Sequence, residues 1–326
     1  MKRQTINTLF ASAATLCLIA ATSQEAKAFG IGKWTYARDS FTDSTAFASS
    51  DKKSPLYYTT AVGGTAFEIY GIAFSQVGNT VFIAINANMG RDGWTTTDDR
   101  VPKNTVGANK GIRNVGWGDL IFNFSGKPTF AEANPNQLFG VRFAYGSDSK
   151  LTADGLYKNI TTTSVTNINS GWSNFNSYNN YVSTHLGTQK LTGGNKNTPS
   201  LGHLAANSPY FDQTKAAPTS IASGVKVAND NFTLLDEAAL IARGLNFAEG
   251  LKAGSTPLGS HTFGFSFTRT EEMKGNFIAH LFAECANDGV ALEGEMVPEP
   301  TTILGTTLAG FGLLGAKLRK RRQAAS

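Results

Sequence analysis

Oxygen-bearing side chains at the ends of apolar segments are the best candidates for chemistry in this sequence. Asp119 precedes one apolar run and Asp288 closes another, and similar positions are held by Asn86, Asn88, Asp92, Asp98 and Asp99. Calcium takes about six to eight oxygen ligands from flexible loops, so Asp119 and Asp288 are candidate calcium ligands if one end of the fold brings them together. No Asp-x-Asp-x-Asp-Gly loop is present, and Asx turns that close strands are the favoured alternative interpretation.

The motifs of common hydrolases are missing. No Gly-x-Ser-x-Gly elbow occurs, and the four His residues follow no zinc-protease spacing. His280 lies in an apolar strand, where a hydrogen-bonded structural imidazole is favoured over a catalytic base. Asp98-Asp99 and Glu271-Glu272 are adjacent pairs. Neighbours on a strand point to opposite faces, whereas a glycosidase needs two converging carboxylates, so both pairs are interpreted as solvated turn residues. We therefore expect no catalytic residues, no enzymatic activity and no cofactor other than the candidate calcium ion.

Cys285 is the only cysteine outside the first 28 residues. A protein in an oxidising compartment would keep it either as a buried strand residue or as a thiol for intermolecular pairing. Burial is favoured by the apolar alternation of Phe277, Ala279, Leu281, Ala283 and Cys285.

Short β-strands are the elements that must position these residues. Apolar runs at 66–76 and 80–86 flank Val77-Gly78-Asn79, which predicts a β-hairpin. Every second residue of Thr262–Thr268 is Phe, so this strand should bury one face and leave the other small and polar. Further strands are predicted at 119–124, 139–145, 160–168 and 277–285. Residues 234–243 are predicted to form a helix capped by Gly244, and 170–217 to form long loops.

Composition agrees with a β-rich fold. The chain has 34 Gly among 326 residues and only 16% charged residues, which is unlike a helical bundle or a coiled coil. We predict a single antiparallel β-sandwich of jelly-roll type over residues 29–296, because the strands are short and evenly spaced and no linker divides them.

The distribution of charge argues against nucleic-acid binding. Of the 29 basic residues, eight lie in the two terminal segments, so the net charge of +5 belongs to the ends of the chain. Residues 29–296 are close to neutral. A nucleic-acid-binding protein needs its basic residues on the folded domain, where they neutralise phosphates.

Residues 1–28 have the three parts of a secretory signal peptide. Lys2 and Arg3 form the charged start, an apolar stretch follows, and Ala26 and Ala28 place small residues where signal peptidase cleaves. We therefore expect export through the Sec translocon and a mature N-terminus at Phe29.

The C-terminal residues 297–326 combine three features. Pro298, Glu299 and Pro300 precede an apolar, Gly-rich run from Thr302 to Ala316. A basic cluster follows, made of Lys317, Arg319, Lys320, Arg321 and Arg322. The apolar run predicts a short transmembrane helix in the inner membrane, and the basic cluster holds the C-terminus on the cytoplasmic side.

This tail resembles the PEP-CTERM sorting signal of Gram-negative bacteria, with Pro298, Glu299 and Pro300 at its three defining positions. The resemblance implies processing by an exosortase, with transient residence in the inner membrane and delivery to the cell surface or extracellular matrix. Segments of the body resemble the XDD-type exosortase-dependent surface proteins of cyanobacteria, a family that supplies no established catalytic residues: 67–71, 85–88, 116–124 and 278–288.

Two functions are compatible with these observations. The first is a structural or interaction role in the surface layer. The alternative is a carbohydrate-binding module, with or without calcium, that binds extracellular polysaccharide. Its stacking platform would be formed by Trp94, Trp117, Trp172, Tyr178 and Tyr181.

Overall fold

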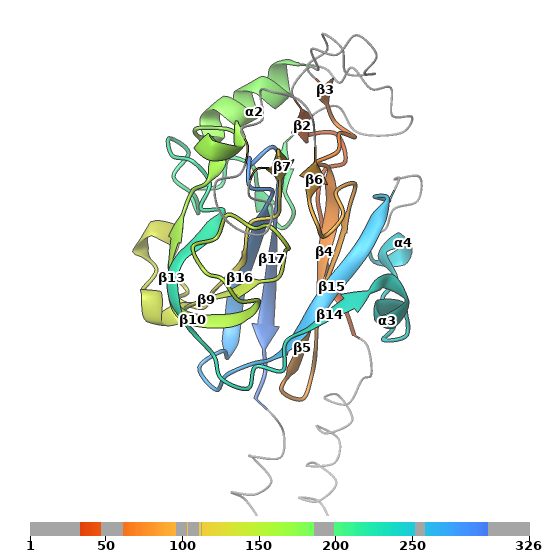
Figure 1. The fold of residues 1–326 in the computed structure, drawn as a ribbon, viewed down its shortest axis with the longest axis vertical. Helices are drawn as coiled ribbons and strands as arrows, with labels where there is room; N and C mark the ends of the chain where they lie inside the picture. The colour runs from red at the N-terminus through yellow and green to blue at the C-terminus, as the bar shows by residue number, and fades with distance from the viewer. Residues whose placement is uncertain are drawn as a thin grey trace, which may run out of the picture.

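The protein is mostly β, with few helices and several antiparallel sheets (Figure 1). The computed structural model describes residues 33–46, 61–95, 103, 111, 113–185, 199–251 and 258–298. Within these residues two large sheets dominate, one of five strands and one of six. They form the frame on which every candidate site lies.

The five-stranded sheet has the order β1-β4-β5-β15-β14. In that order, the strands are Thr35–Arg38, Ile69–Val77, Thr80–Ala87, His261–Thr268 and Thr233–Asp236. β4 and β5 pair antiparallel up to Val77 opposite Thr80, and Gly78 in the turn has a φ of 59°. Glycine adopts this left-handed conformation without a steric penalty, so the predicted hairpin is confirmed.

The six-stranded sheet has the order β13-β10-β9-β8-β16-β17. In that order, the strands are Ser220–Lys226, Gly155–Thr163, Leu138–Arg142, Leu120–Asn123, Gly275–Phe282 and Gly289–Met296. The strands predicted at 119–124, 139–145 and 277–285 are present with shifted ends. The strand predicted at 160–168 is wrong in its second half, because β10 ends at Thr163 and a 3-10 helix, η3, follows at Thr166–Asn169.

Apolar side chains from both large sheets meet in a shared core. Phe74 of β4 contacts Phe277 of β16 edge-on, with ring centroids 5.1 Å apart. Phe267 of β15 contacts Phe122 of β8 in the same way at 6.0 Å. This shared core is what a β-sandwich requires, whereas the jelly-roll connectivity stays a prediction.

The outer face of β15 is covered, which corrects one expectation. Phe263, Phe265 and Phe267 are buried on the inner face as the alternation predicts. Gly264 and Ser266 on the opposite face are also buried. Two short helices, α3 at Glu237–Ile241 and α4 at Phe247–Gly250, supply side chains to a second apolar cluster on this side of the sheet (Figure 1). Small residues therefore mark a close contact here rather than a solvent-exposed face.

The helix predicted at 234–243 is shorter than expected. Residues 234–236 belong to β14, and α3 begins only after Asp236, whose side chain accepts a hydrogen bond from the Ala239 N–H. These residues pair with β15 as a strand, although their intrinsic propensity favours a helix. Gly244 has a φ of 82° just after the helix, which confirms its role at the C-terminal end.

The prediction of long loops over 170–217 holds for 206–217 but is wrong where regular elements form. It contains helix α2 at Phe175–Thr184 and a two-stranded sheet of β11 (Ser200–Leu201) and β12 (Leu204–Ala205). Asn174 caps α2 by accepting a hydrogen bond from the Ser177 N–H at 2.7 Å. Buried side chains of this segment form a third apolar cluster with Phe282 of β16: Phe175, Leu201, Tyr210, Phe211 and Ala217. The segment is therefore a cover for the outer face of the six-stranded sheet.

One end of the molecule collects the short elements. Strands β2 (Thr45–Ala46) and β3 (Ala61–Val62) pair there, and α2 lies nearby. Figure 1 shows these elements at the end opposite the β4–β5 turn and the end of β17. The two ends carry the two candidate sites described below.

A further small sheet pairs β6 (Trp94–Thr95) with β7 (Asn114–Val115).

Candidate functional site

The C-terminal end of the body is fixed to the β4–β5 hairpin. Gln76 Nε2 donates a hydrogen bond to the Val297 carbonyl oxygen at 2.7 Å. The Val297 N–H donates to Gln76 Oε1 at 3.1 Å. This reciprocal pair holds the chain directly after β17, and Pro298 follows it on the surface. Glu299 and Pro300 lie outside the described residues.

A buried group of four carboxylates lies at the other end. Asp39 and Asp43 follow β1, Glu68 precedes β4, and Asp288 is the last residue before β17. Ligand atoms of Asp39, Asp43 and Asp288 lie within 4.8 Å of one another. Glu68 is also buried and lies next to Ile69, whose N–H donates to Asp288, and its charge raises the pKa of both Asp43 and Asp288. We call these four residues the end cluster.

Backbone and hydroxyl donors hold one side of the end cluster. Asp39 Oδ1 accepts from the Ser200 hydroxyl at 2.5 Å and from the Gly202 N–H at 2.9 Å. Asp43 Oδ2 accepts from the Ser200 N–H at 2.6 Å. Glu68 Oε2 accepts from the Ser44 hydroxyl at 2.7 Å and also from the Gly64 N–H. These bonds fix the carboxylates in place.

Asp288 is held differently, by one backbone N–H on each oxygen. Its Oδ2 accepts from the Ile69 N–H at 2.7 Å and its Oδ1 from the Gly289 N–H at 2.8 Å. The other three carboxylates each keep one oxygen that accepts no hydrogen bond: Asp39 Oδ2, Asp43 Oδ1 and Glu68 Oε1. A buried polar atom without a partner is uncommon and calls for a physical explanation.

Burial raises the pKa of each carboxyl group in the end cluster. The pKa of Asp39 rises to about 7 and that of Glu68 to about 8, chiefly through loss of hydration. The pKa values of Asp43 and Asp288 also rise well above their usual range, first through burial and then through repulsion from Asp39. Four negative charges therefore cannot coexist here without compensation.

A second buried carboxylate, Glu284, is fully satisfied. Its Oε2 accepts from the Gly116 N–H at 2.9 Å, and its Oε1 accepts from the Asp148 N–H. Burial raises its pKa well above the usual range, and Asp148 and Asp119 contribute repulsion. Glu284 thus ties the segment before β8 to the loop after β9.

The two predicted calcium ligands lie in different surroundings. Asp119 Oδ2 accepts from the Ile221 N–H at 2.6 Å, and burial raises the pKa of Asp119 to about 7. Asp288 belongs to the end cluster. Among the described residues, the carboxylates that share its space come from Asp39 and Asp43, not from Asp119. Sequence reasoning thus found one of the grouped residues and missed three.

The sequence around Asp39, Asp43 and Glu68 contains a signal that could have identified these three acids as buried. Asp39 and Asp43 are two acids within a short Ser- and Thr-containing segment, Asp39-Ser40-Phe41-Thr42-Asp43-Ser44. Glu68 stands between Phe67 and Ile69, where an apolar strand is about to begin. A carboxylate embedded in an apolar run is a candidate for burial, and a buried carboxylate needs a partner.

His280 and Cys285 are both completely buried. His280 packs edge-on against Phe130 and Phe211, with ring centroids 5.0 Å apart in each case. Burial lowers the pKa of His280 to about 3, so the imidazole is neutral at physiological pH. Burial raises the pKa of Cys285 to about 12, and the predicted burial of this thiol is confirmed.

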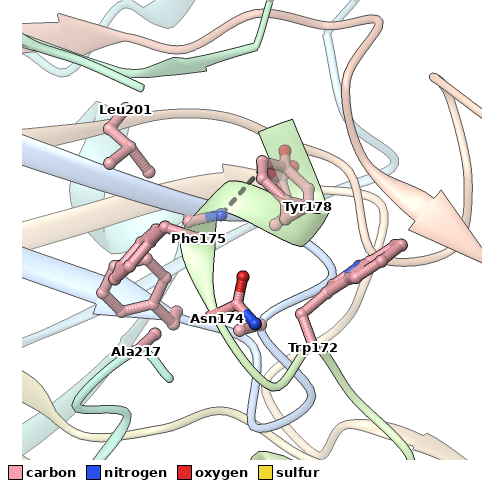
Figure 2. A pocket seen from close by; sticks show the side chains of 10 residues that line it. Trp172, Asn174, Phe175, Tyr178, Leu201 and Ala217 are labelled. Atoms are coloured by element: carbon pink, nitrogen blue, oxygen red, sulfur yellow. Dashed lines mark hydrogen bonds between the residues drawn. The ribbon is translucent and has the colours of Figure 1, made fainter. Parts of the chain in front are cut away.

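The five aromatic residues proposed as a stacking platform do not share one exposed face. Trp117 and Tyr178 are buried and cannot stack on a sugar ring. Trp94 packs on Phe67 at 5.4 Å. Trp172 and Tyr178 instead line a small apolar cavity of about 10 Å³, with room for roughly one water molecule (Figure 2).

Several predicted residues lie outside the described part of the chain. They are Ala26 and Ala28 of the signal peptide, Asp98 and Asp99, Glu299 and Pro300 of the sorting motif, and the basic cluster Lys317, Arg319, Lys320, Arg321 and Arg322. Glu271 and Glu272 are described and lie in the turn between β15 and β16. Glu272 forms an ion pair with Lys158 at 3.6 Å.

Comparison with known proteins identifies the tail. Residues 297–322 match the PEP-CTERM protein-sorting motif. No curated protein and no solved structure is detectably similar to the chain. Within the described ranges, no helix is both long enough and apolar enough to cross a membrane. The chain therefore carries a PEP-CTERM sorting motif, which implies exosortase-dependent sorting of an exported surface protein.

Proposed function

We propose that the body of this chain is a non-catalytic component of the cell surface or extracellular matrix, with a structural or interaction role. An exosortase processes it near Pro298, Glu299 and Pro300 after export through the Sec translocon and removal of residues 1–28 by signal peptidase. The inner membrane holds the tail until that step. The observation that carries the proposal is the sorting motif at 297–322.

The junction between body and tail supports this order of events. β17 ends at Met296, and Gln76 holds Val297 through two hydrogen bonds. The sorting motif thus begins within one residue of a fixed point on the folded body. A motif at the end of a folded domain is accessible to a membrane enzyme without unfolding of the domain. We also infer that residues 29–296 form one sandwich-like domain, because both large sheets share a core.

The sorting motif is tested by substitution of Pro298, Glu299 and Pro300 with Ala. We expect the uncut precursor to accumulate in the inner membrane, because the membrane segment and its orientation are unchanged. Glu295→Ala is the matched control, since Glu295 is an exposed glutamate four residues before Glu299. Precursor size and membrane partition are followed by gel electrophoresis and fractionation. Normal maturation of the triple variant would show that the segment is a plain membrane anchor.

The basic cluster is tested separately. Replacing Lys317, Arg319, Lys320, Arg321 and Arg322 with uncharged residues removes the charge that keeps the C-terminus in the cytoplasm. The short apolar run should then slip through the membrane, and unprocessed protein should be secreted. The control changes Arg319, Arg321 and Arg322 to Lys, which preserves the charge. Retention of the uncharged variant in the membrane would contradict the expected topology.

A second candidate function is carbohydrate binding, favoured by one feature of the surface. The loop after β9 borders an open cleft of about 630 Å³. Its lining combines the half-exposed ring of Tyr145 with polar groups of Arg142, Asp148, Lys150 and Asp154. Glu284 fixes the cleft's base through the Asp148 N–H. An aromatic ring beside fixed polar groups is a common arrangement for sugar recognition.

A glycan array probed with the detergent-solubilised full chain tests this candidate. We expect binding to an extracellular polysaccharide fragment that Tyr145→Ala abolishes. Val225→Ala is the control, because Val225 is a similarly exposed apolar side chain, 56% exposed, outside the cleft lining. Binding unaffected by Tyr145→Ala would exclude this cleft as the glycan site.

A further inference from the structure

We propose that the end cluster is a binding site for one divalent cation, calcium, with Asp39, Asp43 and Asp288 as carboxylate ligands. Glu68 is a fourth buried acid close by, since the N–H of the next residue, Ile69, donates to Asp288. The starting point is the convergence of three carboxylates, from segments far apart in the chain, within 4.8 Å of one another. The proposal concerns the folded body and does not rest on the sorting function.

The unpaired oxygens point to a ligand independently of the clustering. Asp39 Oδ2, Asp43 Oδ1 and Glu68 Oε1 accept no hydrogen bond, although Asp39 is only 2% exposed and the other two residues are 0% exposed. The second oxygen of each carboxylate is fixed by an N–H or hydroxyl donor. One oxygen oriented by the protein and one left open is the arrangement expected of a metal-ligating carboxylate.

The charges around the end cluster also favour a bound cation. Among the described residues, no Lys, Arg or His side chain forms an ion pair with any member of the end cluster. Burial of uncompensated carboxylates is costly, and proteins normally pair such groups or use them to coordinate metals. A divalent cation would compensate two charges at once.

The type of ligand atom favours calcium over zinc and magnesium. All candidate ligands are oxygens and none is a His or Cys, which disfavours zinc. The ligand atoms lie within 4.8 Å of one another, which is compatible with calcium–oxygen distances of about 2.3 to 2.6 Å. Magnesium gives up its water reluctantly and is seldom held by a set of protein ligands alone, so a buried group of carboxylates favours calcium.

A bound ion would tie together four distant parts of the chain. Asp39 and Asp43 come from the segment after β1, Glu68 from the start of the β4–β5 hairpin, and Asp288 from the turn between β16 and β17. Ser200 of β11 joins them through its hydrogen bonds to Asp39 and Asp43. The site thus links both large sheets and the cover segment at one end of the body.

Two aromatic side chains provide a spectroscopic reporter. The Tyr178 hydroxyl donates to the Asp43 carbonyl oxygen at 3.0 Å, and Trp172 Nε1 donates to Thr45 Oγ1 at 2.8 Å. Terbium is a luminescent substitute for calcium that is excited through nearby aromatic rings. Terbium bound in the end cluster should therefore emit when Trp172 and Tyr178 absorb.

The first experiment uses the full chain in mild detergent after treatment with EDTA. Calorimetric titration with calcium chloride should show one ion per chain, and thermal unfolding should shift to higher temperature in millimolar calcium. Magnesium chloride at the same concentration should give a smaller shift. Terbium should give sensitised emission that calcium displaces. Identical melting in EDTA and calcium, with no calcium heat, would overturn the proposal.

The second experiment locates the ion. Asp39→Asn and Asp43→Asn each keep an oxygen that can accept the existing hydrogen bonds but remove a charged ligand. We expect calcium to bind at least tenfold more weakly in each variant. Asp119→Asn is the matched control, because Asp119 is equally buried but lies outside the group. Calcium affinity lost in Asp119→Asn and kept in Asp39→Asn would overturn the assignment.

Folding of the variants does not decide the question alone. If Asp39→Asn fails to fold, native mass spectrometry of the unsubstituted chain still reports whether one calcium ion is retained, and its absence counts against the site. Trp172→Phe supplies an additional check. It should reduce terbium emission while leaving calcium affinity unchanged, and unchanged emission would place the ion elsewhere.

Discussion

Glu284 and Asp288 lie four residues apart in the turn between β16 and β17, yet they serve different surroundings. Both are completely buried, and burial raises the pKa of both carboxyl groups well above the usual range. Each carboxylate oxygen of Glu284 accepts a hydrogen bond from one backbone N–H group. Asp288 also accepts two N–H groups but stands beside Asp39 and Asp43, which have unpaired oxygens.

This difference separates a structural carboxylate from a ligand-binding one. Burial and the direction of the pKa shift are the same in both places, so neither property identifies a site. Unpaired buried oxygens occur in both places, since Asp119 Oδ1 and Asp148 Oδ1 near Glu284 also lack a donor. The distinguishing feature is convergence: among the described residues, three carboxylates place ligand atoms within 4.8 Å of one another only in the end cluster.

The largest expected effect comes from removing the structural carboxylate. Glu284→Ala leaves the Gly116 and Asp148 N–H groups without an acceptor in the interior. At about 1 to 3 kcal/mol for each unsatisfied group, the free energy of unfolding should fall by roughly 2 to 6 kcal/mol. Denaturant unfolding measures this loss, and calcium should not change it. Glu284→Gln, which keeps one oxygen, should lose about half as much, and a loss below about 1 kcal/mol for Glu284→Ala would contradict the structural role.

With calcium in excess, the contribution of Asp119 to the pH dependence of stability is the difference between the original chain and Asp119→Asn, because Glu284 and Asp148, whose pKa values are also raised, contribute to both profiles. The folded-state pKa of Asp119 is about 7, above its ordinary value of 3.8. Below pH 4 the group is protonated in both states and adds no penalty. As pH rises from about 4 to 7, the unfolded state ionises first, so stability falls by an amount on the order of 3 to 4 kcal/mol.

Asp119→Asn should make that part of the profile less steep in urea unfolding measured at each pH. Asp212→Asn, an exposed carboxylate in a turn, serves as the control and should leave the slope unchanged. A profile that is identical for Asp119→Asn and the original chain would show that Asp119 is ionised in the folded protein.

A smaller effect is expected at Cys285, which lies between the two carboxylates in the chain. Cys285→Ser places a hydroxyl in the shared core and should lower stability by about 1 to 2 kcal/mol. Because burial raises the pKa of the thiol to about 12, iodoacetamide should label it only after unfolding. Rapid labelling of the folded chain, or a disulfide-linked dimer, would show that the thiol is accessible and support the alternative of intermolecular pairing.

The smallest effect is expected at Ala286 in the same turn. Its φ of 51° lies in the left-handed region that favours glycine. Ala286→Gly should therefore raise the free energy of unfolding by about 0.5 kcal/mol, without changing calcium affinity, as measured by chemical unfolding and calorimetry. A loss of stability would indicate that the Ala286 methyl group contributes more through packing than the backbone loses through strain.

Much of the β-structure was predictable because it depends on local patterns. Alternating Phe residues in β15 and the Val77-Gly78-Asn79 turn each determine conformation through neighbours in sequence. The limits of α3 were not predictable in the same way. Residues 234–236 favour a helix by composition but pair with β15, so a distant strand determines their conformation.

The two candidate sites likewise differ in whether neighbouring residues in the sequence were enough to predict them. The sorting motif at 297–322 was recognisable from sequence because its three parts are contiguous in the chain. The sequence indicated Asp288 as an oxygen ligand at the end of a strand. Its predicted partner, Asp119, lies outside the end cluster and accepts a hydrogen bond from the Ile221 N–H instead. The partners that Asp288 has, Asp39 and Asp43, are about 250 residues away in the chain.

The sequence by itself determined that this protein is mostly β and that it carries a sorting motif, because strand periodicity and the motif are both encoded by neighbouring residues. Only the tertiary structure decided which buried acids bring their oxygens within 4.8 Å of one another. That depends on which distant segments the fold places side by side. The spacing of residues along the chain gives no information on a contact between segments about 250 residues apart.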